Sequence, residues 1–71
     1  MMHSIKDIAK RYEEISILRK DTDIFYAKDF FEFTKQNAKK YDVLENGDDL
    51  LCSSWYIDDL LRDFRTKLKN K

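Results

Sequence analysis

The first third of the chain repeats apolar residues at the spacing of one helical face. Ser4 is a favoured N-cap residue, and Asp7, three positions later, completes a capping box. Arg19 and Lys20 follow at the end of the segment, where cations stabilise the negative end of a helix dipole. The pattern therefore predicts a helix over residues 4–20. Its apolar positions recur at intervals of three, four and three residues, namely Ile5, Ile8, Tyr12 and Ile15.

The middle of the chain holds a wider apolar face. The polar triplet at residues 21–23 supplies capping side chains for a second helix over residues 23–44. On a helical wheel two neighbouring apolar stripes cover roughly 180° of this helix, against the ~100° that packing on one core requires. Phe25 falls among the polar residues. The stripes are Ile24, Ala27, Phe31, Thr34, Ala38 and Tyr41, and Tyr26, Phe30, Phe33 and Leu44.

Residues 45–49, with the sequence ENGDD, are the only clear break in the pattern. The Asn-Gly pair at residues 46–47 can take the left-handed conformation that ends a helix. Residues 48–53 then either cap and join the next helix or form a separate short turn. A further stripe predicts a third helix over residues 54–69. Its members are Ile57, Leu60, Leu61, Phe64 and Leu68.

Three amphipathic segments with short connections predict an all-α fold. The expected architecture is a small antiparallel three-helix arrangement in a single domain, residues 1–71. The absence of Pro and the presence of only one Gly favour long helices over turns. A core of this size supplies only ~3–5 kcal/mol of net stability.

Composition indicates where the protein works. One Cys excludes an intrachain disulfide and favours a reducing compartment. The N-terminal residues lack the apolar run of a signal peptide, and no stretch approaches the ~20 apolar residues of a membrane span. We therefore expect a cytoplasmic protein with no membrane partner. The abundance of Lys, Asn, Ile and Phe is typical of AT-rich genomes, such as those of some phages and low-GC bacteria.

Side chains for catalysis are sparse. A nucleophile such as Cys52 would need a nearby base, and the only His is His3, in the terminal segment. One Cys and one His cannot form a zinc cluster. Residues 42–53 look like a calcium loop at first. However, Leu44 stands where the second oxygen ligand is needed, and Ser53 stands where the loop requires a bidentate Glu. We predict no catalytic residue, no metal site and no cofactor, and we expect that the protein is not an enzyme.

The wide aromatic face of the second predicted helix suggests self-association. In a monomer the other two helices could cover this face between them. If they do not, an exposed patch of Phe and Tyr has the composition of a protein interface. The prediction is a homodimer formed through Tyr26, Phe30 and Phe33.

A second candidate interface surrounds Trp55. Trp55 and Leu51 lie about 80–120° from the apolar stripe of the third helix, so they are either surface anchors or part of a turn that folds inward. Large surface aromatics are frequent binding hot spots. Residues 42–59 carry six acidic and no basic side chains, whose field would attract a basic partner. The predicted partner-binding residues are Leu51, Trp55, Tyr56, Asp48, Asp49, Asp58 and Asp59.

The resulting hypothesis is a small non-catalytic helical module that binds a larger protein as a regulator or inhibitor. An antitoxin, an immunity protein or an anti-defence factor of a phage or mobile element would share these features. The alternative is a small nucleic-acid-associated transcriptional regulator that uses its basic C-terminal helix, and a third possibility is an enzyme accessory subunit. Fourteen basic and fourteen acidic residues cancel, so we expect nucleic acid binding to be weak and non-specific.

Overall fold

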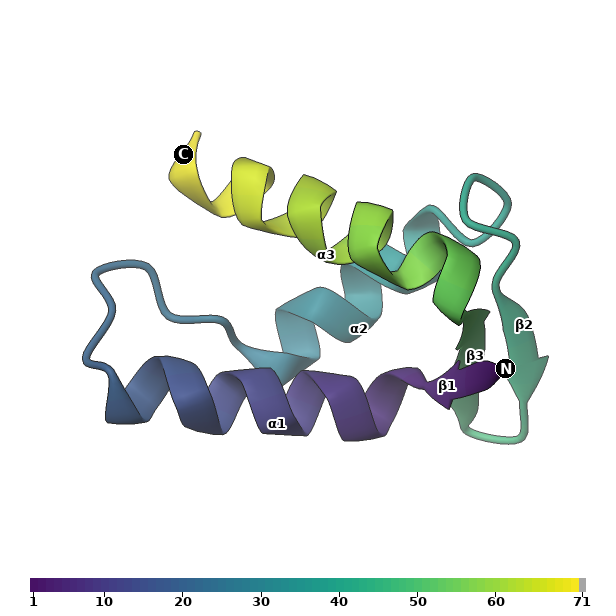
Figure 1. Cartoon of the computed structure of the whole chain (residues 1–71), viewed down its shortest axis with the longest axis horizontal. Coiled ribbons are helices and arrows are strands. Elements are labelled where there is room, and N and C mark those ends of the chain that lie inside the picture. The colour runs from purple at the N-terminus through teal and green to yellow at the C-terminus, as the bar shows by residue number, and fades with distance from the viewer. Residues whose placement is uncertain (71) are drawn as a thin grey trace.

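The computed structural model describes residues 1–70 and has an α+β fold, with three helices beside a three-stranded antiparallel sheet (Figure 1). The prediction of an all-α fold is therefore wrong. Lys71 lies outside the described residues. In chain order the elements are β1 (Met2–Ser4), α1 (Ile5–Leu18), α2 (Ala27–Gln36), β2 (Leu44–Asn46), β3 (Asp49–Ser53) and α3 (Ser54–Lys69).

The sheet joins the N-terminus to the segment that precedes α3. Its strand order is β1-β3-β2, with β3 in the centre. Met2 lies opposite Ser53 in the β1–β3 pair, and Leu44 lies opposite Leu51 in the β2–β3 pair. Residues 48–53, expected to be a turn or the start of the third helix, instead contribute the central strand.

The ENGDD segment is a hairpin turn and not a helix end. Gly47 has φ +62° and is the first of the two residues between β2 and β3. This is the position at which a type II′ hairpin turn requires Gly, because other residues are strained at positive φ. The left-handed conformation predicted for this site is present, but it forms the turn between two strands and does not end a helix.

The second helix is much shorter than the predicted 23–44. Residues 24–26 are extended, α2 begins at Ala27, and it ends at Gln36. At its end the Asn37 side chain donates a hydrogen bond of 2.8 Å to the Phe33 carbonyl oxygen. A series of turns then leads to β2, with Asp42 at φ 53°. The apolar residues beyond residue 36, which the helical wheel assigned to the second helix, therefore belong to a turn, and Tyr41 of this turn packs on the core.

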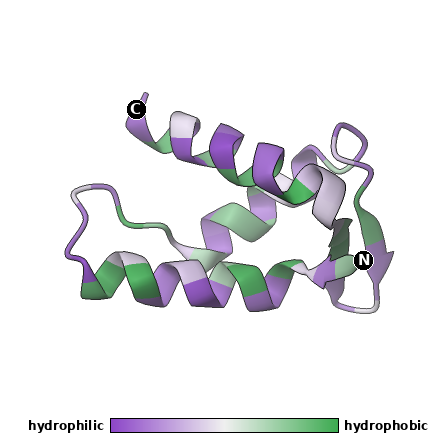
Figure 2. Ribbon diagram, viewed as in Figure 1, coloured by the Kyte–Doolittle hydropathy of each residue, from purple (hydrophilic) through white to green (hydrophobic). Residues whose placement is uncertain are grey.

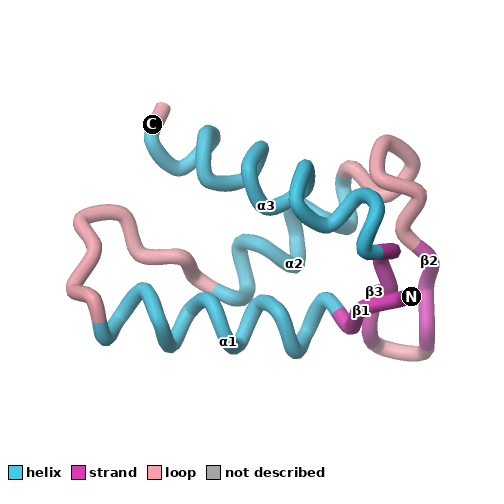
Figure 3. The backbone as a smooth tube through the Cα atoms, in the orientation of Figure 1, coloured by secondary structure: helices cyan, strands magenta, loops and turns pink. Residues whose placement is uncertain are grey.

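Both long helices begin at the sheet and run toward the opposite end of the molecule, where the C-terminus lies (Figure 1). They therefore point in the same direction. The shorter α2 lies between them, and the loop of residues 19–26 connects the far end of α1 to α2 (Figure 3). No helix within residues 1–70 combines the length and apolar character that a membrane crossing demands.

An aromatic cluster forms the centre of the core. Phe64 of α3 has its ring centroid 4.9 Å from Phe25, 5.2 Å from Phe30 and 5.4 Å from Phe33. Tyr12 of α1 joins the cluster through Phe25, at 5.6 Å. The dense aromatic segment at residues 25–33 is thus mainly a packing device. Along α1 and α3, hydrophobic bands alternate with hydrophilic ones (Figure 2).

The connection between α1 and α2 is held by side chains of α1. The Ser16 hydroxyl accepts a hydrogen bond of 2.9 Å from the buried Phe25 amide, and Glu13 accepts one of 2.7 Å from the Ala27 amide. These bonds fix an extended segment that has no secondary structure of its own. Phe25, which the wheel placed among polar residues, is thereby turned into the core with 4% of its surface exposed.

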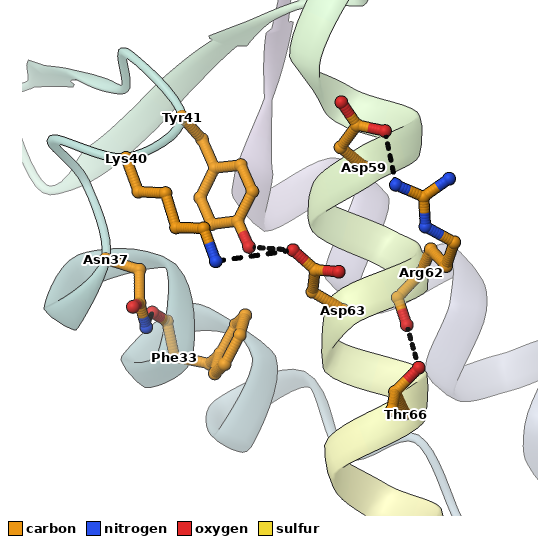
Figure 4. A network of polar contacts seen from close by, with 8 residues as sticks. All are labelled: Phe33, Asn37, Lys40, Tyr41, Asp59, Arg62, Asp63 and Thr66. Carbon is orange, nitrogen blue, oxygen red and sulfur yellow. Dashed lines mark hydrogen bonds and ion pairs between the residues drawn. The ribbon is translucent and has the colours of Figure 1, made fainter.

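The turn after α2 is attached to α3 by a polar network (Figure 4). The Tyr41 hydroxyl donates a hydrogen bond to the Asp63 carboxylate, and Lys40 Nζ lies 3.7 Å from the same oxygen. Burial, together with this bond and the charge of Asp63, raises the pKa of Tyr41 to about 12. The bond from Tyr41 in turn keeps the pKa of Asp63 below its ordinary value.

Candidate functional site

Trp55 is the most conspicuous apolar side chain on the surface. It lies in the first turn of α3, and 80% of its area is exposed. The buried face of α3 consists of the five residues predicted from the stripe, and Trp55 lies outside that face. The wheel argument for its position is therefore confirmed. An indole placed this way combines a large apolar area with an N–H donor.

Exposed apolar side chains of the sheet lie at the same end of the molecule. Along β3, Leu50 and Cys52 are buried, while Leu51 points to the other face and is half-buried. The strand register puts Leu44 and Met2 on the face of Leu51, with 56% and 40% of their areas exposed. The Ser54 amide donates a hydrogen bond of 3.0 Å to the Met1 carbonyl oxygen, which ties the start of α3 to β1. We call Met2, Leu44, Leu51 and Trp55 the sheet-end surface.

One of the four predicted acidic partner residues has an internal structural role. Asp49 accepts hydrogen bonds from the Ser4 hydroxyl, from the Lys6 amide at 3.1 Å and from the Leu50 amide at 2.7 Å. Burial alone would raise its pKa, but these bonds and the charge of Lys6 outweigh burial and lower the pKa. Ser4 also accepts the Asp7 amide at 3.2 Å, as the capping prediction required.

The other three acids lie nearer the surface, Asp48 in the hairpin turn beside the start of α1, and Asp58 and Asp59 near the start of α3. Asp48 pairs with Lys6 at 2.9 Å, which lowers the pKa of Asp48, and Asp59 pairs with Arg62 at 2.8 Å. The Asp58 side chain makes no hydrogen bond or ion pair with any other residue of the described chain. Exposed pairs such as these are worth at most ~1 kcal/mol, so a partner can compete for them. The acidic rim of the sheet-end surface is therefore Asp48, Asp58 and Asp59.

The remaining predicted contact residues divide between core and surface. Tyr56 is half-buried against the core, and Phe30 is fully buried. Phe33 is half-buried, with Lys67 Nζ 5.2 Å from its ring centroid. Of the three residues assigned to self-association, only Tyr26 is largely exposed, at 52%. The face that they were expected to share is therefore occupied by the monomer's own core.

The chemistry of Cys52 is limited by its position. Its side chain is fully buried, and its thiol donates a hydrogen bond of 3.7 Å to the Tyr41 carbonyl oxygen. Burial raises the pKa of the thiol, which disfavours the reactive thiolate. His3 lies directly opposite Cys52 in the β1–β3 pair. The sulfur is sealed from solvent in this structure, while His3 is half-buried. Within residues 1–70 there is also no group of three or more potential ligands arranged around a metal site.

Sequence reasoning missed Met2 and Leu44 as surface residues, because their exposure depends on strands that it did not foresee. The signal that was available is the Gly47-Asp48 pair, because Gly at the first of two loop residues indicates a type II′ hairpin. Comparison of the chain with family models, with curated proteins and with solved structures found no match.

Proposed function

We propose that the protein is a small non-catalytic cytoplasmic binding module that docks on a larger protein through its sheet-end surface and regulates or inhibits it. The observation that supports the proposal is the exposure of Trp55. A side chain of this size with 80% of its area in solvent adds little to the stability of the monomer. Its area becomes favourable only when a partner covers it.

The chemistry around Trp55 defines the partner surface. Leu44, Leu51 and Met2 extend the apolar area across the sheet, and Asp48, Asp58 and Asp59 place negative charge at its edge. An apolar centre with a charged rim is the usual composition of an interface between proteins that also exist separately. The partner is expected to present an apolar pocket for the indole, with Lys or Arg side chains beside it.

Site-specific photocrosslinking tests this proposal. A photoreactive phenylalanine analogue at position 55 should crosslink one defined protein in the native host, which can then be purified for titration. Trp55→Ala should weaken binding of that protein by about 2 kcal/mol or more, roughly 30-fold, as hot-spot truncations do. Tyr26→Ala is the matched control, because Tyr26 is also an exposed aromatic but lies outside the sheet-end surface. Equal affinities of wild type and Trp55→Ala would refute the proposal.

A further inference from the structure

A groove lies between the C-terminal halves of α1 and α3, far from the sheet-end surface. The two helices diverge toward this end of the molecule (Figure 1). The groove has a volume of about 320 Å³, and a second hollow continues it along α3 past Arg62 and Leu61 as far as Asp58, in the acidic rim. Tyr12, Phe25 and Leu68 contribute apolar surface, and no described residue of α2 lines the groove.

The apolar surface of the groove continues onto α1. Ile15 forms part of the wall and has 38% of its area exposed. Leu18, three residues further along the helix, is 81% exposed. Residues three apart on a helix lie on neighbouring parts of its surface. The apolar face of α1 is therefore broader than the part that the core covers.

Cations line this apolar surface on the sides of α1 and α3. Arg19, Arg65 and Lys69 line the groove, and none has a carboxylate oxygen within ion-pairing distance among residues 1–70. The Arg65 guanidinium lies 5.1 Å from the Tyr12 ring centroid, a contact that holds it at the wall and leaves its charge unneutralised. The groove thus offers an apolar centre between positive walls.

The dimensions and charges of the groove suit a helix. Residues 61–69 of α3 span about 12 Å at the helical rise, which matches roughly two turns of a bound helix. Asp21 and Asp23 lie at the loop end of the groove and would repel a continuous run of phosphates, whereas single carboxylates can be placed beside the cations. We propose that the groove binds an amphipathic helix of a partner protein, with apolar residues inward and Asp or Glu on its flanks.

This interface is separate from the sheet-end surface and does not depend on the role of Trp55. A display library of helical 16-residue peptides, about four turns long, selected on the full-length protein tests it. The selected peptides should have apolar residues at i, i+3 or i+4, and i+7, flanked by acidic residues. Arg65→Glu and Ile15→Ser should each weaken their binding at least tenfold, about 1.4 kcal/mol.

Lys28→Glu is the matched control, because it makes the same charge change on an exposed side chain of α2, away from the groove. Peptide affinity should be unchanged in this variant and in Trp55→Ala, and thermal melting of each variant verifies that it is folded. Replacing the acidic residues of a selected peptide by Lys should abolish binding. Peptides that lack this pattern, or that bind Arg65→Glu as tightly as wild type, would overturn the proposal. Tighter binding of a single-stranded oligonucleotide that displaces the peptides would identify a nucleic acid surface instead.

Discussion

A single carboxylate connects the hairpin to the first helix. Asp49, at the start of β3, receives two backbone amides and the Ser4 hydroxyl, and Ser4 caps α1. This links an orphan amide of the helix N-terminus, that of Lys6, to a residue more than forty positions later in the chain. A negative charge at this place also interacts favourably with the helix dipole. Asp49 therefore contributes to the fold, while its neighbour Asp48 remains on the surface.

The acid sensitivity of folding tests this role of Asp49. Its folded pKa lies below the ordinary 3.8, so its stabilising effect is complete above that pH and disappears as the pH falls through the folded pKa. Asp49→Asn should lose about 1–2 kcal/mol of unfolding free energy at about pH 7, as removal of a charged hydrogen-bond acceptor does. Urea titrations at neutral and acid pH should show this deficit shrinking as the pH falls below 3.8 and through the lower folded pKa. Asp58→Asn is the control, and an equal loss in both variants would contradict the assignment.

The helices differ in how well the sequence predicts them. The predicted bounds of α3 agree with the structure, and those of α1 differ by only one or two residues, because a buried stripe and a cap act locally. The strands were missed because β1 and β2 have only three residues each, and the five residues of β3, DLLCS, do not alternate between apolar and polar types. Their pairing also joins Met2 to Ser53 across most of the chain. The exposure of Trp55 could be predicted from the helical wheel. The structural role of Asp49 could not, because its hydrogen bonds to Ser4 and Lys6 form only when the hairpin packs against the start of α1.

The C-terminus of α1 offers a test at the scale of an element. The Lys20 amide donates to the Ile17 carbonyl and the Asp21 amide to the Ser16 carbonyl, which together form a Schellman motif with Lys20 in the left-handed conformation, φ 55°. Gly is preferred here because other residues are strained.

Lys20→Gly should therefore raise the free energy of unfolding by about 0.5–1 kcal/mol, since relief of strain exceeds the added flexibility of the unfolded chain. Lys10→Gly, in the middle of the same helix, should lower it by about 1 kcal/mol. Urea denaturation of the two variants distinguishes the effects. A loss of stability in both would show that the cap is not strained.

At the scale of the whole molecule, one cluster of rings holds every helix. Tyr12 comes from α1, Phe25 from the connecting loop, Phe30 and Phe33 from α2, and Phe64 from α3. The sheet closes one end of the core through Leu50 and Cys52. The two surfaces proposed to bind partners lie outside this core, the sheet-end surface at one end of the molecule and the groove at the other. The protein should therefore stay folded when Trp55 is replaced and should unfold when a ring of the cluster is removed.

Truncation of Phe64 tests this division. Phe64 is 2% exposed and contacts three other rings, so Phe64→Ala should lose about 3–5 kcal/mol. A core of this size supplies only ~3–5 kcal/mol in total, so the variant should be largely unfolded at room temperature. Trp55→Ala should remain within about 0.5 kcal/mol of wild type, because its side chain is mostly in solvent. Circular dichroism of both variants during urea titration measures the difference. If Trp55→Ala unfolds instead, the indole belongs to the core and the binding surface must lie elsewhere. If Phe64→Ala stays fully folded, the ring cluster does not hold the helices together.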